Sequence, residues 1–299
     1  MGGCAGGRSG VASTDLTIGA ITGRKTTRMS AQRKVDPEAF FAQNSIFTLE
    51  AWAASQGKEG ALTAARDQLK HHLKRARVRS LSRGLYLSVP HGVDPAATKP
   101  DPYLCAVAKC ADAVFCYHAA LELLGAAHST WNECTVFCEP RRKPLALADA
   151  TVRFLAPPLP LRRRRLEELG IISVSWQGKT LQVTGRERTL VEGFREPRYV
   201  GGLEELVESA GGFGVLDLDL LRRMLEAYAE KNLWALVGWF LDLHRQRFHP
   251  PASLLDLCEA KRPAKPVNVP RSQRGGRLLP RWNLVLSESL LRSFEGNPP

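Results

Sequence analysis

Residues 62–88 read LTAARDQLKHHLKRARVRSLSRGLYLS, and the residue pattern changes twice along this stretch. Its first part carries an apolar stripe at helical spacing: Leu62, Ala65, Leu69 and Leu73. This spacing predicts an amphipathic helix. The part from Val78 onward reverses direction between Ser82 and Gly84 and continues into an apolar segment. It therefore predicts two short antiparallel strands joined by a tight turn.

Two helices are expected before this stretch. Asp36 can cap the first helix, Pro37 suits its first turn, and Thr48 can cap the second. Three helices followed by a hairpin make the plan of a winged helix-turn-helix domain, which we expect over residues 35–97. The alternative is a solvated helix and hairpin in an unrelated small domain.

The predicted third helix and hairpin are strongly basic. Between Lys58 and Arg83 there are eight Lys or Arg and two acidic residues, so this segment holds half of the chain's net charge of +12. In a winged helix-turn-helix domain the third helix would enter the major groove of DNA and the hairpin would lie along the phosphate backbone.

Two sets of DNA contacts are therefore expected. Three side chains would face base edges, with Arg66 able to read guanine: Thr63, Arg66 and Lys70. Five would bind phosphates: Lys74, Arg75, Arg77, Arg79 and Arg83. If about six phosphates are neutralised, the log of the affinity should fall with the log of the salt concentration at a slope of about −5.

The bulk composition is that of a folded protein with an anionic partner. The 299 residues are 44% hydrophobic, which is enough for a core, and no apolar run is long enough to cross a membrane. The positive charge favours nucleic acid ahead of an acidic membrane surface, and we expect no membrane partner. Residues 1–34 are expected to be a disordered leader without the features of a signal peptide, which predicts a cytoplasmic, nucleoid-associated protein. Whether residues 1–28 belong to the natural protein stays open.

The seven cysteines form no C-x-x-C pair. Their odd number and the absence of a signal peptide predict reduced thiols. Cys134 and Cys138 would share one face of a strand as small buried residues. A zinc site that adds His118 and His128 is the alternative, but its spacing matches no usual ligand pattern. We predict no metal site and no cofactor.

A second domain is expected over residues 98–299, after a linker rich in Pro, Gly and small polar residues. It should be a mixed α/β region with a helical C-terminal half. Strands are expected near residues 134–139 and 151–156, as a hairpin at 171–184, and as a closing strand at 278–286. The fold class predicted for the whole chain is α+β, mainly helical.

Two further basic segments have two interpretations each. The run Arg162–Arg165 could bind phosphates, but we favour a solvated helix that stops at Gly170, on which Glu167 and Glu168 pair with the arginines. The segment 261–281 holds seven Lys or Arg and no acid, and whether it contacts DNA stays open.

Several phrases resemble a known family. RSLSRGLYLSVP at 79–90, VTGRERTLVEGF at 183–194 and GGLEEL at 201–206 are similar to segments of the AbiEi family, which are antitoxins of bacterial type IV toxin–antitoxin systems. The resemblance spans residues 37–290. It implies an N-terminal winged helix-turn-helix that binds inverted repeats in operator DNA and represses its own operon. It also implies a C-terminal antitoxin domain that opposes a nucleotidyltransferase-like toxin without forming a stable complex. We expect a monomer or a dimer assembled on DNA.

The family signature falls on five residues at the start of a predicted helix: Arg186, Glu187, Arg188, Thr189 and Glu192. Because Arg188 and Glu192 are four residues apart on a helix, they can form an ion pair that fastens the preceding hairpin to the helical half. We interpret this signature as structural.

An enzyme is the less favoured alternative. The sequence has no phosphate-binding loop, no G-x-G-x-x-G, no G-x-S-x-G and no H-E-x-x-H, so we predict no catalytic residue. The competing hypotheses are a winged-helix regulator without a toxin and a nuclease-like enzyme that processes DNA.

Overall fold

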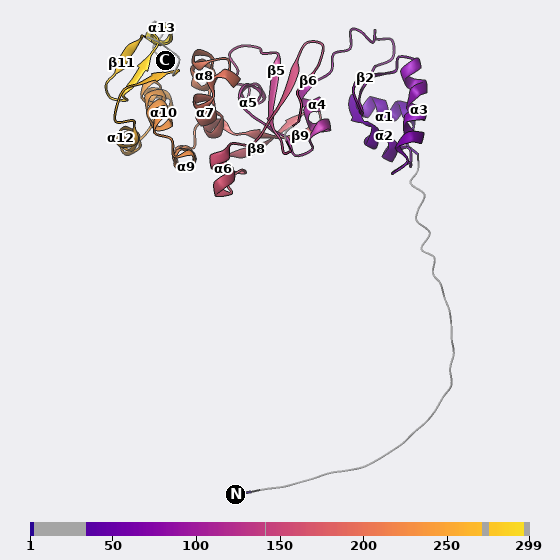
Figure 1. The fold of residues 1–299 in the computed structure, drawn as a ribbon, viewed down its shortest axis with the longest axis horizontal. Coiled ribbons are helices and arrows are strands. Elements are labelled where there is room, and N and C mark those ends of the chain that lie inside the picture. The colour runs from indigo at the N-terminus through magenta and orange to yellow at the C-terminus, as the bar shows by residue number, and fades with distance from the viewer. Residues whose placement is uncertain (3–33, 141, 271–274, 296–299) are drawn as a thin grey trace. The chain divides into compact units, whose positions relative to one another are not determined.

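The computed structural model describes residues 1, 2, 34–140, 142–270 and 275–295 (Figure 1). The chain divides into two units, residues 1–33 and 34–299. The predicted leader, residues 1–34, therefore lies almost wholly outside the described residues. Every helix and strand of the described residues belongs to the second unit.

The first part of this unit contains three helices and a three-stranded sheet: α1 (Pro37–Gln43), β1 (Ile46–Thr48), α2 (Leu49–Ser55), α3 (Leu62–Lys74), β2 (Val78–Ser82) and β3 (Leu85–Ser88). The predicted caps are present, because the Asp36 carboxylate accepts from the Ala39 amide at 3.0 Å and the Thr48 hydroxyl accepts from the Ala51 amide at 3.2 Å. The strands are antiparallel in the order β1-β3-β2. Strand β1 was not predicted, since three residues between two caps are too few to show a strand period.

An aromatic core holds these elements together. Trp52 is fully buried, stacks on Phe41, and donates its indole N–H to the Ala65 carbonyl at 3.1 Å, which ties α2 to α3. Truncating a buried Trp to Ala costs about 3–5 kcal/mol. From the central strand β3, Leu85 packs into the same apolar cluster as Tyr103, so residues 35–97 share core contacts with the residues that follow.

A six-stranded sheet forms the middle of the unit. Its elements are α4 (Pro102–Lys109), β4 (Val114–Phe115), α5 (His118–Leu123), β5 (Glu133–Phe137), β6 (Leu145–Ala146), β7 (Thr151–Leu155), α6 (Leu159–Arg164), β8 (Ile171–Trp176) and β9 (Lys179–Thr184). The strand order is β6-β7-β5-β4-β9-β8. The pairs β5–β7 and β4–β9 are parallel and the other neighbours are antiparallel.

The last part is mostly helical: α7 (Arg186–Arg195), the 3-10 turn η1 (Pro197–Tyr199), α8 (Leu203–Gly211), α9 (Leu218–Tyr228), α10 (Lys231–Leu243), α11 (Arg245–Phe248), α12 (Ala252–Lys261), β10 (Val267–Val269), β11 (Arg277–Leu279), β12 (Leu284–Leu286) and α13 (Glu288–Glu295). Helix α10 contacts both α7 and α12, and its residues from Leu233 to Leu241 are all buried (Figure 1). The described residues therefore form a mixed helical and sheet fold, compatible with the predicted α+β class.

Three sequence expectations were wrong in this region. The closing strand at 278–286 is two strands, β11 and β12, because Asn283 takes a positive φ of 51° in the turn between them. Helix α6 ends at Arg164, since Arg165 adopts a left-handed conformation, so Glu167 and Glu168 lie beyond it. Arg162 pairs instead with Glu139 at 3.0 Å.

The prediction of reduced thiols was also wrong for one pair of cysteines. Cys110 and Cys138 form a disulfide with their Cα atoms 6.6 Å apart. The other four cysteines in the described segments are free and buried: Cys105, Cys116, Cys134 and Cys258. The sequence could not predict the pairing, because Cys110 and Cys138 meet only when α4 and β5 are in place.

Candidate nucleic-acid interface

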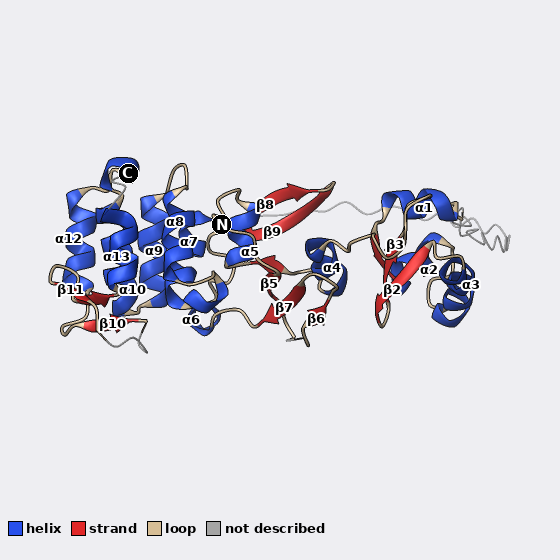
Figure 2. Cartoon of the chain, turned by 90° about the horizontal axis from the view of Figure 1, so that it is seen from above, coloured by secondary structure: helices blue, strands red, loops and turns tan. Residues whose placement is uncertain are grey.

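Helix α3 separates an apolar face from a basic one. Ala65 and Leu69 are fully buried against α2. Four side chains spaced by three and four residues follow a neighbouring row of the helix, and all are exposed: Thr63, Arg66, Lys70 and Lys74. Figure 2 shows α3 beside α2, in the same part of the chain as β2 and β3. The predicted base-facing residues are thus available to a partner on one row.

One acid modifies this row. Asp67 lies 2.7 Å from Lys70 Nζ, and that hydrogen bond, with the charges of Lys70 and Arg66, lowers the pKa of Asp67. Both side chains of the pair are well exposed to solvent. A fully solvated pair of this kind contributes little to stability, because water screens the two charges, so a phosphate can displace Asp67 from Lys70.

Two arginines of the predicted phosphate-binding set lie in turns and are exposed. Arg75 is the C-terminal cap of α3, and Arg83 lies in the turn between β2 and β3. Gly84 follows Arg83 with a φ of +74°, a conformation that side chains with a Cβ rarely adopt. The glycine therefore permits the reversal that places Arg83 at the tip of the hairpin.

The other two hairpin arginines have partners within the chain. Arg77 donates to the Glu38 carboxylate and to the Val89 carbonyl, and its hydrogen bond to Glu38 is the main cause of that carboxyl's lowered pKa. Arg79 donates to the carbonyls of Pro95 and Thr98, at 2.7 and 2.8 Å. Both guanidinium groups therefore fasten neighbouring segments to the hairpin, a role that the charge pattern alone did not indicate.

Two cations near the hairpin tip escaped sequence reasoning. Lys109, at the end of α4, donates through Nζ to the Arg83 carbonyl at 2.9 Å. Burial lowers the pKa of Lys109, and the nearby charge of exposed Arg142 adds to this shift. Sequence spacing could not have found either residue, because Lys109 meets the hairpin, and Arg142 comes near Lys109, only through the tertiary fold.

Four of the five residues that resemble the AbiEi signature are buried at the start of α7: Glu187, Arg188, Thr189 and Glu192. Arg188 donates through Nε to Glu192 at 2.8 Å, and through Nη1 to the carbonyls of Glu167 and Leu169. Glu192 also accepts from the Tyr228 hydroxyl at 2.6 Å. Burial raises the pKa of Glu192 although Arg188 opposes the shift. The predicted i, i+4 pair is present, and it fastens α7 to the segment that precedes β8.

The remaining signature residues also make internal contacts. Thr189 shares a hydrogen bond with the Thr184 hydroxyl at 2.7 Å, and Glu187 accepts from the Asp217 amide at 2.8 Å. Arg186 is exposed and lies 3.4 Å from the Val215 carbonyl. These contacts hold α7 against β9 and the start of α9.

The zinc alternative with histidine ligands does not assemble. His118 is buried, with its ring nitrogens 3.5 Å from Glu122 and 3.6 Å from Glu205, while the His128 amide donates to Glu205. The metal-ligand grouping present in the described residues is a different one: Cys110, Asp112 and Cys138.

The second basic segment, 261–281, is partly engaged within the chain. Lys261 lies over the Trp234 ring at 4.7 Å, and Arg262 lies 3.7 Å from Glu259. Arg281 bonds Glu259 at 3.0 Å and Asp242 at 3.1 Å. Residues 271–274 of this segment lie outside the described residues.

No family model matches the chain, and no curated protein matches it. Among solved structures, it resembles the Rv2827c protein from Mycobacterium tuberculosis with a TM-score of 0.57 and 20% identity, over 89% of this chain and 97% of that chain. At this identity the likeness shows the fold alone. The resemblance to AbiEi antitoxins therefore stays a prediction. Among the described residues, no helix is long and apolar enough to span a membrane.

Proposed function

We propose that the chain is a DNA-binding transcriptional repressor whose residues 35–97 act as a winged helix-turn-helix. The observation that carries the proposal is the row of exposed side chains on α3, next to a hairpin tip that carries Arg83. The order α1, β1, α2, α3, β2, β3, with its three-stranded antiparallel sheet, supports the same interpretation.

The proposed docking divides the contacts by chemistry. Arg66 and Thr63 read base edges from α3 in the major groove. Lys70 leaves its ion pair with Asp67 and binds DNA instead. Lys74, Arg75 and Arg83 bind phosphates and set the register. Arg77 and Arg79 act indirectly, because they hold the hairpin and the segment behind it in place.

Binding titrations on DNA from upstream of the chain's own gene, and on a scrambled duplex, test the assignment. Arg66→Ala should reduce the preference for the upstream duplex, since a bidentate contact to guanine discriminates by about 1–3 kcal/mol. Arg83→Ala should weaken both duplexes about equally. Lys99→Ala, which removes the same charge from an exposed site paired with Asp149, is the matched control. Equal losses for all three variants on both duplexes would refute the interface.

The antitoxin role is proposed on the AbiEi resemblance. We propose that the C-terminal part, residues 98–299, counters a nucleotidyltransferase-like toxin encoded next to this gene, without a stable complex. Expression of the neighbouring gene alone and together with this chain, scored for growth, tests this role. An Arg66→Ala, Lys74→Ala, Arg83→Ala triple variant should lose operator binding and keep the rescue.

This triple variant is preferable to deleting residues 1–97, because the deletion would expose the apolar cluster that Leu85 shares with Tyr103. Rescue that fails with the intact chain, in the presence of operator binding, would favour a regulator without a toxin. Time-dependent cutting of a plasmid in the presence of Mg²⁺ would favour the nuclease alternative.

A further inference from the structure

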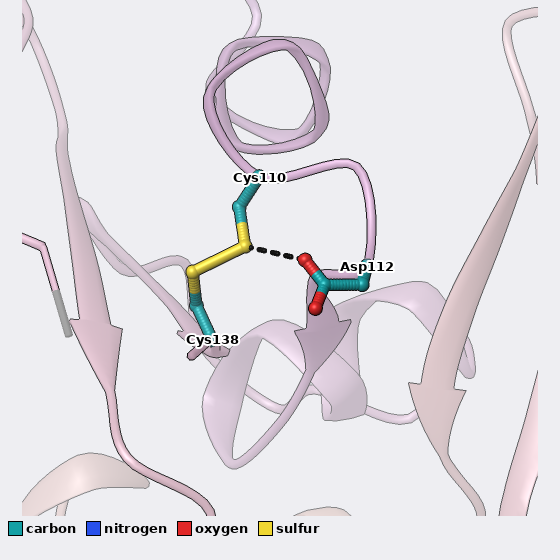
Figure 3. Close-up of side chains that lie close together, drawn as sticks. All are labelled: Cys110, Asp112 and Cys138. Carbon is teal, nitrogen blue, oxygen red and sulfur yellow. Dashed lines mark hydrogen bonds between the residues drawn. A yellow bond between two sulfur atoms is a disulfide. The ribbon is translucent and has the colours of Figure 1, made fainter. Parts of the chain in front are cut away.

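A cluster of metal-ligand side chains lies where α4 ends and β5 ends (Figure 3). Cys110 is the C-terminal cap of α4, and Asp112 follows in a turn closed by the Ala113 amide, which donates to the Cys110 carbonyl at 3.1 Å. Cys138 comes directly after β5. One ligand atom from each of Cys110, Asp112 and Cys138 lies within 4.8 Å of the others.

The contact between Asp112 and Cys110 is unexpected for a disulfide. Asp112 Oδ1 lies 3.0 Å from Cys110 Sγ. A disulfide sulfur carries no hydrogen, so in the oxidised form nothing is donated across this contact, whereas a thiol would donate its proton. Asp112 is exposed, and no Lys or Arg within the described ranges pairs with its carboxylate. A thiol proton or a shared cation would explain why the carboxylate faces sulfur.

We propose that the dithiol form of this cluster binds one thiophilic divalent cation, through the thiolates of Cys110 and Cys138 and the carboxylate of Asp112. The disulfide is then the oxidised, cation-free state of the same site. Thiolate and carboxylate are ligand types of zinc, with bonds of about 2.3 Å to sulfur. The 6.6 Å between the Cα atoms is near the upper end of the disulfide range, so rotation of the side chains can part the two sulfurs around a cation.

The surroundings supply a fourth coordination position for the cation. A cavity of about 300 Å³ borders Asp112 and Cys138 and is also lined by Glu139, Arg162 and Arg188. Because Glu139 pairs with Arg162 at 3.0 Å, the fourth ligand would be water in this cavity. Both cysteines are nearly fully buried directly after regular elements, which limits the rearrangement that binding requires.

The disulfide and dithiol states interconvert by a two-electron reaction. Reduction breaks the sulfur–sulfur bond with two electrons and two protons and yields two thiols. A phosphine reductant supplies the electrons and, with one water, becomes the phosphine oxide. Each thiol then releases its proton when it ligates the cation.

Metal titration of the full-length chain tests the proposal. The protein is reduced with a phosphine, freed of reductant under argon, and titrated with Co²⁺. We expect one equivalent to bind with thiolate-to-cobalt charge-transfer absorption, and Zn²⁺ to displace it. The oxidised protein should show no such absorption. A reduced protein without the absorption would overturn the proposal.

Variants assign the ligands. Cys138→Ser should abolish the charge-transfer absorption, and Asp112→Asn should weaken affinity by more than about 100-fold, the upper end of the loss expected for an outer-shell group. Cys105→Ser is the control, because Cys105 is a buried free cysteine within α4. This variant should keep both the absorption and the affinity. Retention of the full absorption by Cys138→Ser would contradict the assignment.

A measurement on the unmodified chain guards against misfolded variants. Zn²⁺ should slow the alkylation of Cys110 and Cys138, read by mass spectrometry, at least tenfold relative to the reduced metal-free protein. Equal alkylation rates with and without Zn²⁺ would overturn the proposal.

Discussion

Replacing Arg188 by Met should destabilise the fold in a strongly pH-dependent way. The Arg188 side chain is 1% exposed and that of Glu192 is 0% exposed, so the substitution leaves a buried carboxylate without its cation. Of the two residues whose carbonyls also accept from Arg188, Glu167 lines the same cavity as Arg188, so water there can replace the guanidinium. The carboxylate keeps the hydrogen bond from the Tyr228 hydroxyl and the weaker influence of the Arg195 charge. Removing one partner of a buried ion pair costs about 3–5 kcal/mol.

The sign of the pH dependence follows from Glu192. Its pKa is raised by burial even with Arg188 present, and losing Arg188 removes the main opposing influence. A carboxyl with a raised pKa in the folded state contributes stability that is present below its unfolded value of 4.5 and lost as pH rises through the folded pKa. The cost of Arg188→Met should therefore be large at pH 7.5 and shrink toward pH 5.

Urea denaturation at both pH values, followed by Trp fluorescence, measures the effect. The double variant Arg188→Met, Glu192→Gln should recover about 1–3 kcal/mol relative to additivity. The control is Arg222→Met, which breaks a pair of the same spacing at an exposed site, where the cost should stay within about 1 kcal/mol. A loss at Arg188 that matches the control, or that does not change with pH, would refute the reasoning.

Further expectations concern packing, protonation and the hairpin. Burial lowers the pKa of His244 to about 4, so the folded state should lose about 2–3 kcal/mol as pH falls from 6.5 toward 4; His244→Leu should abolish that loss in denaturant titrations at each pH. In Gly238→Ala, the new Cβ would collide with the Trp282 ring and cost about 1–3 kcal/mol, whereas Gly214→Ala, with open space around its Cβ, should be neutral or stabilising in the same melting assay. Arg79→Ala should speed the hydrogen exchange of backbone amides around Pro95 and Thr98, whose carbonyls Arg79 holds. Unchanged exchange rates would show that Arg79 does not hold this segment. The log of the DNA affinity should fall with the log of the salt concentration at a slope of about −3.5 rather than −5, because only about four cations of the interface remain available to phosphates. A slope near −5 would indicate that Arg77 and Arg79 also bind phosphates.

Local patterns in the sequence predicted the N-terminal elements well. The caps at Asp36 and Thr48, the stripe of α3 and the reversal at Gly84 all depend on residues within one or two turns of each other. Such features are encoded by short-range spacing, and the structure has them where they were expected. The ion pair of Arg188 and Glu192 belongs to the same class, since both residues lie on one helix.

Features that depend on tertiary contacts were not predictable. Arg77 and Arg79 look like DNA ligands in the sequence, yet their partners Glu38, Pro95 and Thr98 come from other segments. The grouping of Cys110 with Cys138 likewise depends on how α4 meets β5. Charge density reveals that a surface is basic, but only the fold decides which cations are already occupied.

The two-residue strand β4 has a mechanical consequence. It joins the strands β6-β7-β5 to β9-β8 through the pairings of Val114 and Phe115, to which Cys116 adds two hydrogen bonds with Thr135. Because so short a strand supplies few hydrogen bonds between the two parts of the sheet, these parts can fluctuate separately. The disulfide between Cys110 and Cys138 links the segment before β4 to the end of β5, next to the pairing of Val114 with Phe137. We therefore expect the two parts of the sheet to fluctuate more independently when the disulfide is reduced.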